Sequence, residues 1–214
     1  MNYEHKRQLI GAAETLVQEN KLTHYFKARE AFQTLLKEPG NVEIRKQFEE
    51  NYSKFYHLNS RIVGQEFIDP YFQELFLLDL NTLADPYQKL LLTLKLSSRR
   101  RVCMQFSFVS KLVATHDDSK AIYDSNVRRF LAKLPGLSLS IPPSTDRPHN
   151  DEVRIRRYIE VLKEIQKEYE SWEPEFDEIC TPLLERIPKL KDCHRNKVWD
   201  FLVWTAGRKS VMGK

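Results

Sequence analysis

Two residues in the middle of the chain have the types and settings that glycosidic-bond chemistry requires. Lys111 lies in the apolar segment 106–114, and Asp124 directly precedes the segment 125–134. Cleavage of an N-glycosidic bond leaves an electron-deficient sugar carbon, which a carboxylate can stabilise and an amine can capture as a Schiff base. The amine must be neutral to attack, and apolar neighbours favour the neutral form by desolvation. The pair therefore indicates a site that acts on a sugar carbon.

Each of these two residues also has an ordinary structural interpretation. Asp124 precedes a segment of helical periodicity, where an aspartate commonly accepts backbone N–H groups as the N-cap. Lys111 is equally consistent with a surface lysine beside a buried apolar stripe. The sequence alone leaves both interpretations open.

Basic charge gathers around the pair. The stretch 99–136 contains eight basic and three acidic residues, a surplus of five, whereas the whole chain has a net charge of +4. Positive charge near two consecutive helices suits a phosphate backbone, and we expect it to share one surface with Lys111. The alternative is a solvated face without a ligand. The side chains expected to contact nucleic acid are Arg99, Arg100, Arg101, Ser110, Asn126, Arg128 and Arg129.

Short motifs around both residues resemble a known superfamily. They are Ser110-Lys111, Ile122-Tyr123-Asp124-Ser125-Asn126-Val127 and the terminal segment 198–208. The first two resemble the helix-hairpin-helix DNA glycosylases, in which a lysine on one helix is followed by an aspartate that caps the next. The chain is more closely similar to bacterial proteins with an 8-oxoguanine DNA glycosylase fold, some of which are associated with antiphage defence. The hairpin is degenerate, because Ser-Ser-Arg-Arg-Arg at 97–101 replaces its glycine-rich turn.

The resemblance implies a function in DNA repair or antiphage defence. A protein of this kind would bind double-stranded DNA and extrude a base. Lys111 would be the Schiff-base nucleophile, and Asp124 would stabilise the oxocarbenium-like sugar. The alternative is a non-catalytic helical module that retains the fold and binds nucleic acid or a protein partner in a defence system.

No cofactor or metal is expected. The sequence has no glycine-rich phosphate loop. The run at His116, Asp117 and Asp118 is typical of a turn, and Cys193-His194 with Cys180 provides too few ligands for structural zinc.

The elements that must position the pair are expected to be helices. Glycine is scarce, at 6 in 214 residues, and apolar residues recur at spacings of three and four. We predict an all-α, compact multi-helix domain over 1–214, with an N-terminal lobe at 1–96 and a glycosylase-like core at 97–214. The core would place helices 105–115 and 125–134 side by side and carry an exposed loop at 137–151. The expected helices are 1–38, 42–56, 71–78, 87–96, 105–115, 126–134, 152–172 and 193–208, with a short helix or turn at 182–187. No segment alternates convincingly as a strand, and only at 138–141 could tertiary context create one.

Several features favour a cytoplasmic protein with no membrane partner. No apolar run approaches the ~20 residues of a membrane span. The first residues are polar and mixed in charge, unlike a signal peptide. The three cysteines, Cys103, Cys180 and Cys193, are scattered, which fits free thiols in a reducing compartment.

Overall fold

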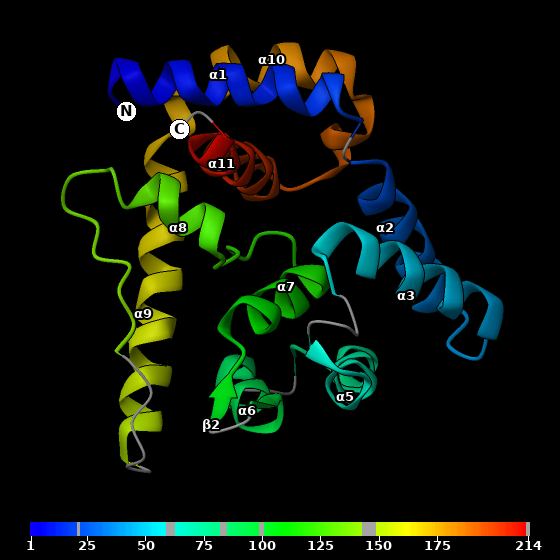
Figure 1. Ribbon diagram of the computed structural model, residues 1–214. Coiled ribbons are helices and arrows are strands. Elements are labelled where there is room, and N and C mark those ends of the chain that lie inside the picture. The colour runs from blue at the N-terminus through cyan, green and yellow to red at the C-terminus, as the bar shows by residue number, and fades with distance from the viewer. Residues whose placement is uncertain (21, 59–62, 82–84, 99–100, 143–148, 213–214) are drawn as a thin grey trace. The chain divides into compact units, whose positions relative to one another are not determined.

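The structure is a computed structural model that describes residues 1–20, 22–58, 63–81, 85–98, 101–142 and 149–212. The described residues are mostly helical, as Figure 1 shows, and this confirms the predicted all-α class. None of the described helices has a stretch long and apolar enough to cross a membrane. The helices are α1 (Tyr3–Gln18), α2 (Thr23–Leu35), α3 (Val42–Tyr56), α5 (Gln65–Leu77), α6 (Pro86–Thr93), α7 (Phe106–His116), α8 (Ser125–Leu131), α9 (His149–Ser171), α10 (Phe176–Arg186) and α11 (Arg195–Met212), with short 3-10 turns at Glu173–Glu175 and Pro188–Asp192.

The chain forms two compact units, one of residues 19–79 and one of residues 1–18 with 80–214. The single helix expected over 1–38 is in fact two helices in different units. Asn20 has a φ of 47°, a left-handed conformation that asparagine tolerates and that ends α1. Helices α1 and α6, which the sequence assigned to the N-terminal lobe, belong with the later residues, because α1 packs on α10 and α11 and α6 packs on α7 and α9.

The unit of residues 19–79 is built from α2, α3 and α5 around an aromatic core. Phe48 and Tyr52 of α3 are buried against rings of α5, and the hydroxyls of Tyr52 and Tyr71 are hydrogen-bonded at 2.6 Å. Helix α3 has the expected bounds, whereas α5 begins at Gln65, well before the helix expected over 71–78. Gly64 is the residue directly before α5. Because the helix begins at Gln65, Pro70 lies inside it and not at its start.

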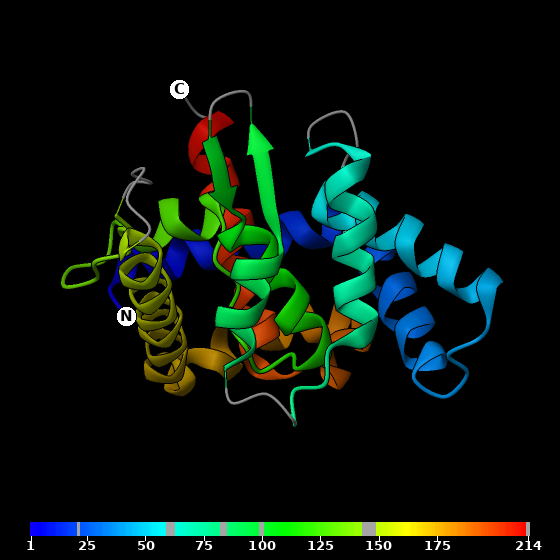
Figure 2. The same ribbon diagram turned by 90° about the horizontal axis from the view of Figure 1, so that it is seen from below.

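A pair of β-strands precedes the helix that carries Lys111. The sequence indicated only the basic run 97–101 at this place and no strand. Strands β1 (Lys95–Ser98) and β2 (Arg101–Met104) pair antiparallel, with Ser98 opposite Arg101, and can be followed in Figure 2. The strands are too short for an alternating pattern to be informative, and their pairing with each other defines them. Residues 138–141, the one strand site allowed by the sequence, form no strand.

Helices α7 and α8 were expected from the sequence to lie side by side, but they do not. Helix α8 packs mainly on α11, and α7 packs on α6. The two helices are connected by the buried segment 121–124, which lies between the end of α7 and the start of α8. This segment therefore determines the geometry of the predicted catalytic pair.

The expected exposed loop 137–151 is partly packed. Leu139 is only 4% exposed. Arg154 and Arg157 of α9 donate hydrogen bonds through Nε to Pro142 O at 3.0 Å and Ser140 O at 3.2 Å. Residues 143–148 lie outside the described residues, and α9 begins at His149.

The contact between α8 and α11 is close enough to require glycine. A Cβ at Gly207 would lie 2.0 Å from the backbone oxygen of Asn126. Gly207→Ala is therefore expected to destabilise the protein by about 1–3 kcal/mol, even though alanine favours helices. Urea unfolding measures the change.

Gly11 provides the matched control, because it also lies in a helix and a Cβ there meets nothing within 4 Å. Gly11→Ala should stabilise the protein by up to ~1 kcal/mol. Equal effects of the two substitutions would contradict the close approach at Gly207.

Candidate functional site

The two residues predicted to be catalytic lie next to each other. Lys111 Nζ, from α7, is 3.7 Å from Asp124 Oδ2, from the residue before α8. Their side chains are only 11% and 7% exposed, respectively, so the ion pair is almost enclosed. The fold thus brings an amine and a carboxylate into one small, largely desolvated space.

Asp124 uses its two carboxylate oxygens differently. Oδ1 accepts hydrogen bonds from the backbone N–H groups of Asn126 at 2.8 Å and Val127 at 3.0 Å, which caps α8. Oδ2 faces Lys111. The capping role that the sequence left as an alternative is therefore real, and it orients the second oxygen toward the lysine.

Ser110 is buried and connects the helix of Lys111 with the segment of Asp124. Its Oγ accepts a hydrogen bond from Tyr123 N at 3.0 Å, so the residue before Lys111 is bonded to the residue before Asp124. Ser110 is 0% exposed. The expectation that it contacts nucleic acid is wrong for this conformation, because its hydroxyl is buried and bonded within the protein.

Burial changes the chemistry of the lysine. Desolvation lowers the pKa of Lys111 below its usual value, and the nearby charge of Asp124 opposes part of that shift. The face of the Phe108 ring lies 5.5 Å from Nζ, a cation–π contact that favours the charged form as Asp124 does. A larger fraction of Lys111 is neutral near pH 7 than for an exposed lysine, and the neutral amine is the nucleophilic form.

The lowered pKa of Lys111 makes stability depend on pH. Between that pKa and ~10.4 the unfolded chain binds more protons than the folded chain, so the free energy of unfolding contributed by this group rises with pH. Lys111→Met should remove this contribution. We expect the unfolding free energy of the wild type minus that of the variant to increase from neutral to alkaline pH in urea titrations. The buried tyrosines titrate in both proteins and cancel in the difference, and a difference independent of pH would contradict the lowered pKa.

The predicted basic surface can be followed only at Arg128 and Arg129 and at Lys111, which is buried. Arg129 Nη1 donates to Asn126 Oδ1 at 2.8 Å and to Gly207 O at 3.1 Å, so these side chains hold α8 on α11. Arg128 is exposed and donates to Tyr123 OH at 3.3 Å. Arg99 and Arg100 lie outside the described residues, as does the side chain of Arg101.

The contacts of α11 and the residue before it with residues 118–122 were not expected from the sequence. His194 N donates to Asp118 Oδ2 at 3.0 Å, and Asn196 Nδ2 donates to Ser119 O at 2.8 Å. One turn further on, Asp200 Oδ1 accepts from Ile122 N at 3.3 Å. The signal in the sequence was Asp200 itself, a lone carboxylate in the apolar run 198–206.

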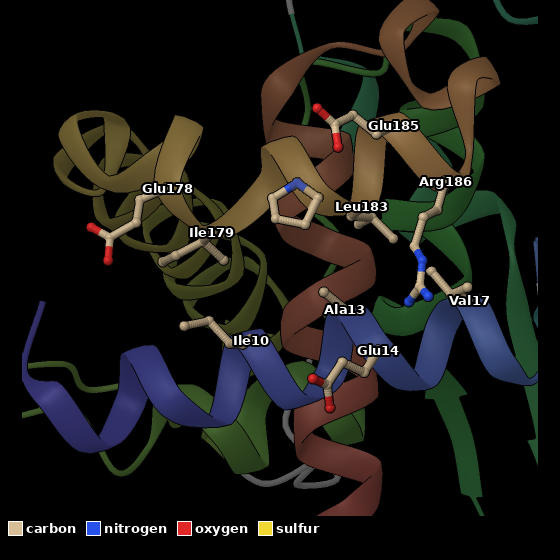
Figure 3. A pocket seen from close by; sticks show the side chains of 10 residues that line it. Ile10, Ala13, Glu14, Val17, Glu178, Ile179, Leu183, Glu185 and Arg186 are labelled. Carbon is tan, nitrogen blue, oxygen red and sulfur yellow. The ribbon is translucent and has the colours of Figure 1, made fainter.

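One groove lies apart from the pair. It lies between α1 and α10 and has a volume of about 350 Å³, and no residue of the predicted site lines it. Figure 3 shows Ile10, Ala13, Ile179 and Leu183 among its lining residues. Within the described ranges, no group of three or more His, Cys, Asp or Glu residues could hold a metal ion.

Comparison with known proteins identifies no relative. No protein-family model, curated protein or solved structure matches this chain.

Proposed function

We propose that the chain is a DNA glycosylase-like protein that acts on damaged or modified double-stranded DNA. The observation that carries the proposal is the enclosed pair of Lys111 and Asp124, 3.7 Å apart, in which burial lowers the pKa of the amine. The motifs shared with proteins of the 8-oxoguanine DNA glycosylase fold agree with this chemistry. They also favour a cytoplasmic role in DNA repair or antiphage defence.

In the proposed reaction, the C1′–N bond breaks, and its electron pair leaves with the base, which takes up a proton. The lone pair of Lys111 Nζ forms a bond to C1′, and the nitrogen loses a proton. The C1′–O4′ bond then breaks with its electron pair going to O4′, which takes up a proton, while the nitrogen lone pair forms the C=N bond of an iminium. Hydride from borohydride reduces this iminium to a stable secondary amine. The negative charge of Asp124 stabilises the positive sugar in the transition state.

The enclosure of the pair sets a condition on this reaction. Only a small part of Lys111 is exposed, so C1′ of a nucleotide extruded from the duplex reaches Nζ only when neighbouring side chains move aside. Among the arginines whose side chains the structure describes near the site, Arg128 is exposed and is a candidate for a phosphate contact.

The test is covalent trapping with borohydride on matched duplexes. One duplex carries 8-oxoguanine, one uracil, one an abasic site, and one is undamaged. Trapping on a damaged duplex but not on the undamaged one supports a glycosylase with an amine nucleophile. Trapping on the abasic duplex alone supports amine capture without base release. The proposal fails if none of the duplexes is trapped and none loses a base.

A second candidate function is a non-catalytic module that binds nucleic acid or a protein partner. The observation that favours it is the double use of Asp124, which both caps α8 and pairs with Lys111, as a purely structural ion pair would. Binding of the duplexes without trapping or base release would favour this module over the enzyme.

A further inference from the structure

Asp200 lies behind the pair and is bonded to the segment that carries Asp124. Its side chain is on α11, and the residue is 2% exposed. Asp200 Oδ1 accepts hydrogen bonds from Ile122 N at 3.3 Å and from Tyr169 OH, on α9, at 2.9 Å. One carboxylate oxygen therefore connects α9, α11 and the 121–124 segment.

The position of Asp124 depends on two adjacent amides of this segment. Tyr123 N–H is held by Ser110 of α7, and Ile122 N–H is held by Asp200 of α11. The first bond connects the segment to the helix of Lys111. The second connects it to the helix on which α8 packs. Loss of either bond leaves the segment with only one of these two side-chain hydrogen bonds. The distance between Asp124 and Lys111 can then vary more.

We propose that Asp200 is a positioning residue, whose carboxylate holds Ile122 and thereby keeps Asp124 in place opposite Lys111. The inference rests on the proposed function and deepens it. Asp200 does not touch the reacting atoms, and it acts only through the 121–124 segment.

The strength of this hold depends on the charge of Asp200. Burial raises the pKa of Asp200 to about 7, while the charge of Lys197 and the bonds from Tyr169 and Ile122 favour the ionised form. Asp124 and, from α6, Tyr87 also lie within its electrostatic reach. An ionised carboxylate accepts a stronger hydrogen bond than a neutral acid. The hold on Ile122 should therefore weaken as the pH falls through about 7.

Asp200→Asn tests the proposal because asparagine keeps the acceptor oxygen and the shape but has no charge. The measurement is the single-turnover trapping rate at saturating protein, as a ratio of wild type to variant at each pH. Titration of Lys111 affects both proteins and cancels in this ratio. We expect the ratio to rise about tenfold through pH 7, as when a charge-assisted hydrogen bond replaces a neutral one. Duplex affinity should stay unchanged. A ratio independent of pH, or a loss that equals the loss of duplex affinity, would overturn the proposal.

Tyr169→Phe is the second variant and does not alter Asp200 itself. It removes a hydrogen bond that favours the ionised carboxylate, so the pKa of Asp200 should rise further. The inflection in the trapping rate should then move to a higher pH than in the wild type. An unmoved inflection would show that a group other than Asp200 titrates there.

Two adjacent amides provide a readout that does not need activity. Hydrogen exchange at Ile122 N–H, after correction for its intrinsic pH dependence, should be about tenfold less protected in Asp200→Asn. Tyr123 N–H, held by Ser110, is the internal control and should change less. If the wild type neither traps a duplex nor releases a base, the proposed function fails, and the positioning role is decided by the carboxyl carbon resonance of Asp124. A shift near pH 7 in the wild type that is absent in Asp200→Asn supports it, and identical titrations overturn it.

Discussion

Lys111→Gln is expected to abolish borohydride trapping and largely preserve duplex binding. The substitution removes the amine proposed to form the Schiff base but little of the side-chain volume. Loss of a covalent nucleophile costs at least ~10³-fold in comparable enzymes. Trapping yield on the abasic and damaged duplexes, with binding measured separately by fluorescence anisotropy, checks this result.

Two further variants make the result specific to Lys111. Lys120→Gln changes a lysine in the same stretch that is 40% exposed and paired with Asp117, and it should trap like the wild type. Lys111→Arg keeps a positive charge beside Asp124 but cannot supply a neutral amine, so it should lose trapping with the ion pair intact. Trapping that survives in Lys111→Arg would assign the Schiff base to another amine.

Asp124→Asn is expected to slow base release by ~10²-fold or more, because it removes a fixed charge placed for the positive sugar. Stability should fall by only ~1 kcal/mol or less, since the asparagine oxygen can still accept from Asn126 N and Val127 N. Single-turnover base release and urea unfolding measure the two effects.

The same change at a second N-cap separates chemistry from structure. Asp85 caps α6 by accepting from Gln88 N at 3.1 Å. Asp85→Asn should cost about as little stability as Asp124→Asn and leave base release unaffected. If Asp124→Asn unfolds the protein, or slows base release no more than Asp85→Asn does, then Asp124 is a structural cap and the non-catalytic module is the better description.

Much of the helical framework followed from local chemistry. The caps at Asn41, Asp85 and Asp124 each bond to backbone groups within the first turn of their own helix. Such bonds need only the cap and the residues directly after it, so they form independently of the fold, and the sequence pointed to the one at Asp124. The apolar surroundings of Lys111 were likewise visible in the run 106–114, and the structure adds that the residue is buried.

Other features depended on partners far away in the chain, which spacing cannot reveal. Ser110 is bonded within the protein because it accepts from Tyr123 N, and Arg129 is bonded within the protein because it donates to Gly207 O of α11. The hairpin of β1 and β2 exists through pairing, not through a pattern in either strand.

By itself, the sequence determined the helical class, offered a cap at Asp124 as one of two interpretations and singled out the candidate pair, because helix periodicity and capping act over one or two turns. Only the tertiary structure decided that Lys111 and Asp124 meet, and that Asp200 holds the segment between α7 and α8. Those contacts join residues from different elements, and their geometry arises only when the elements pack.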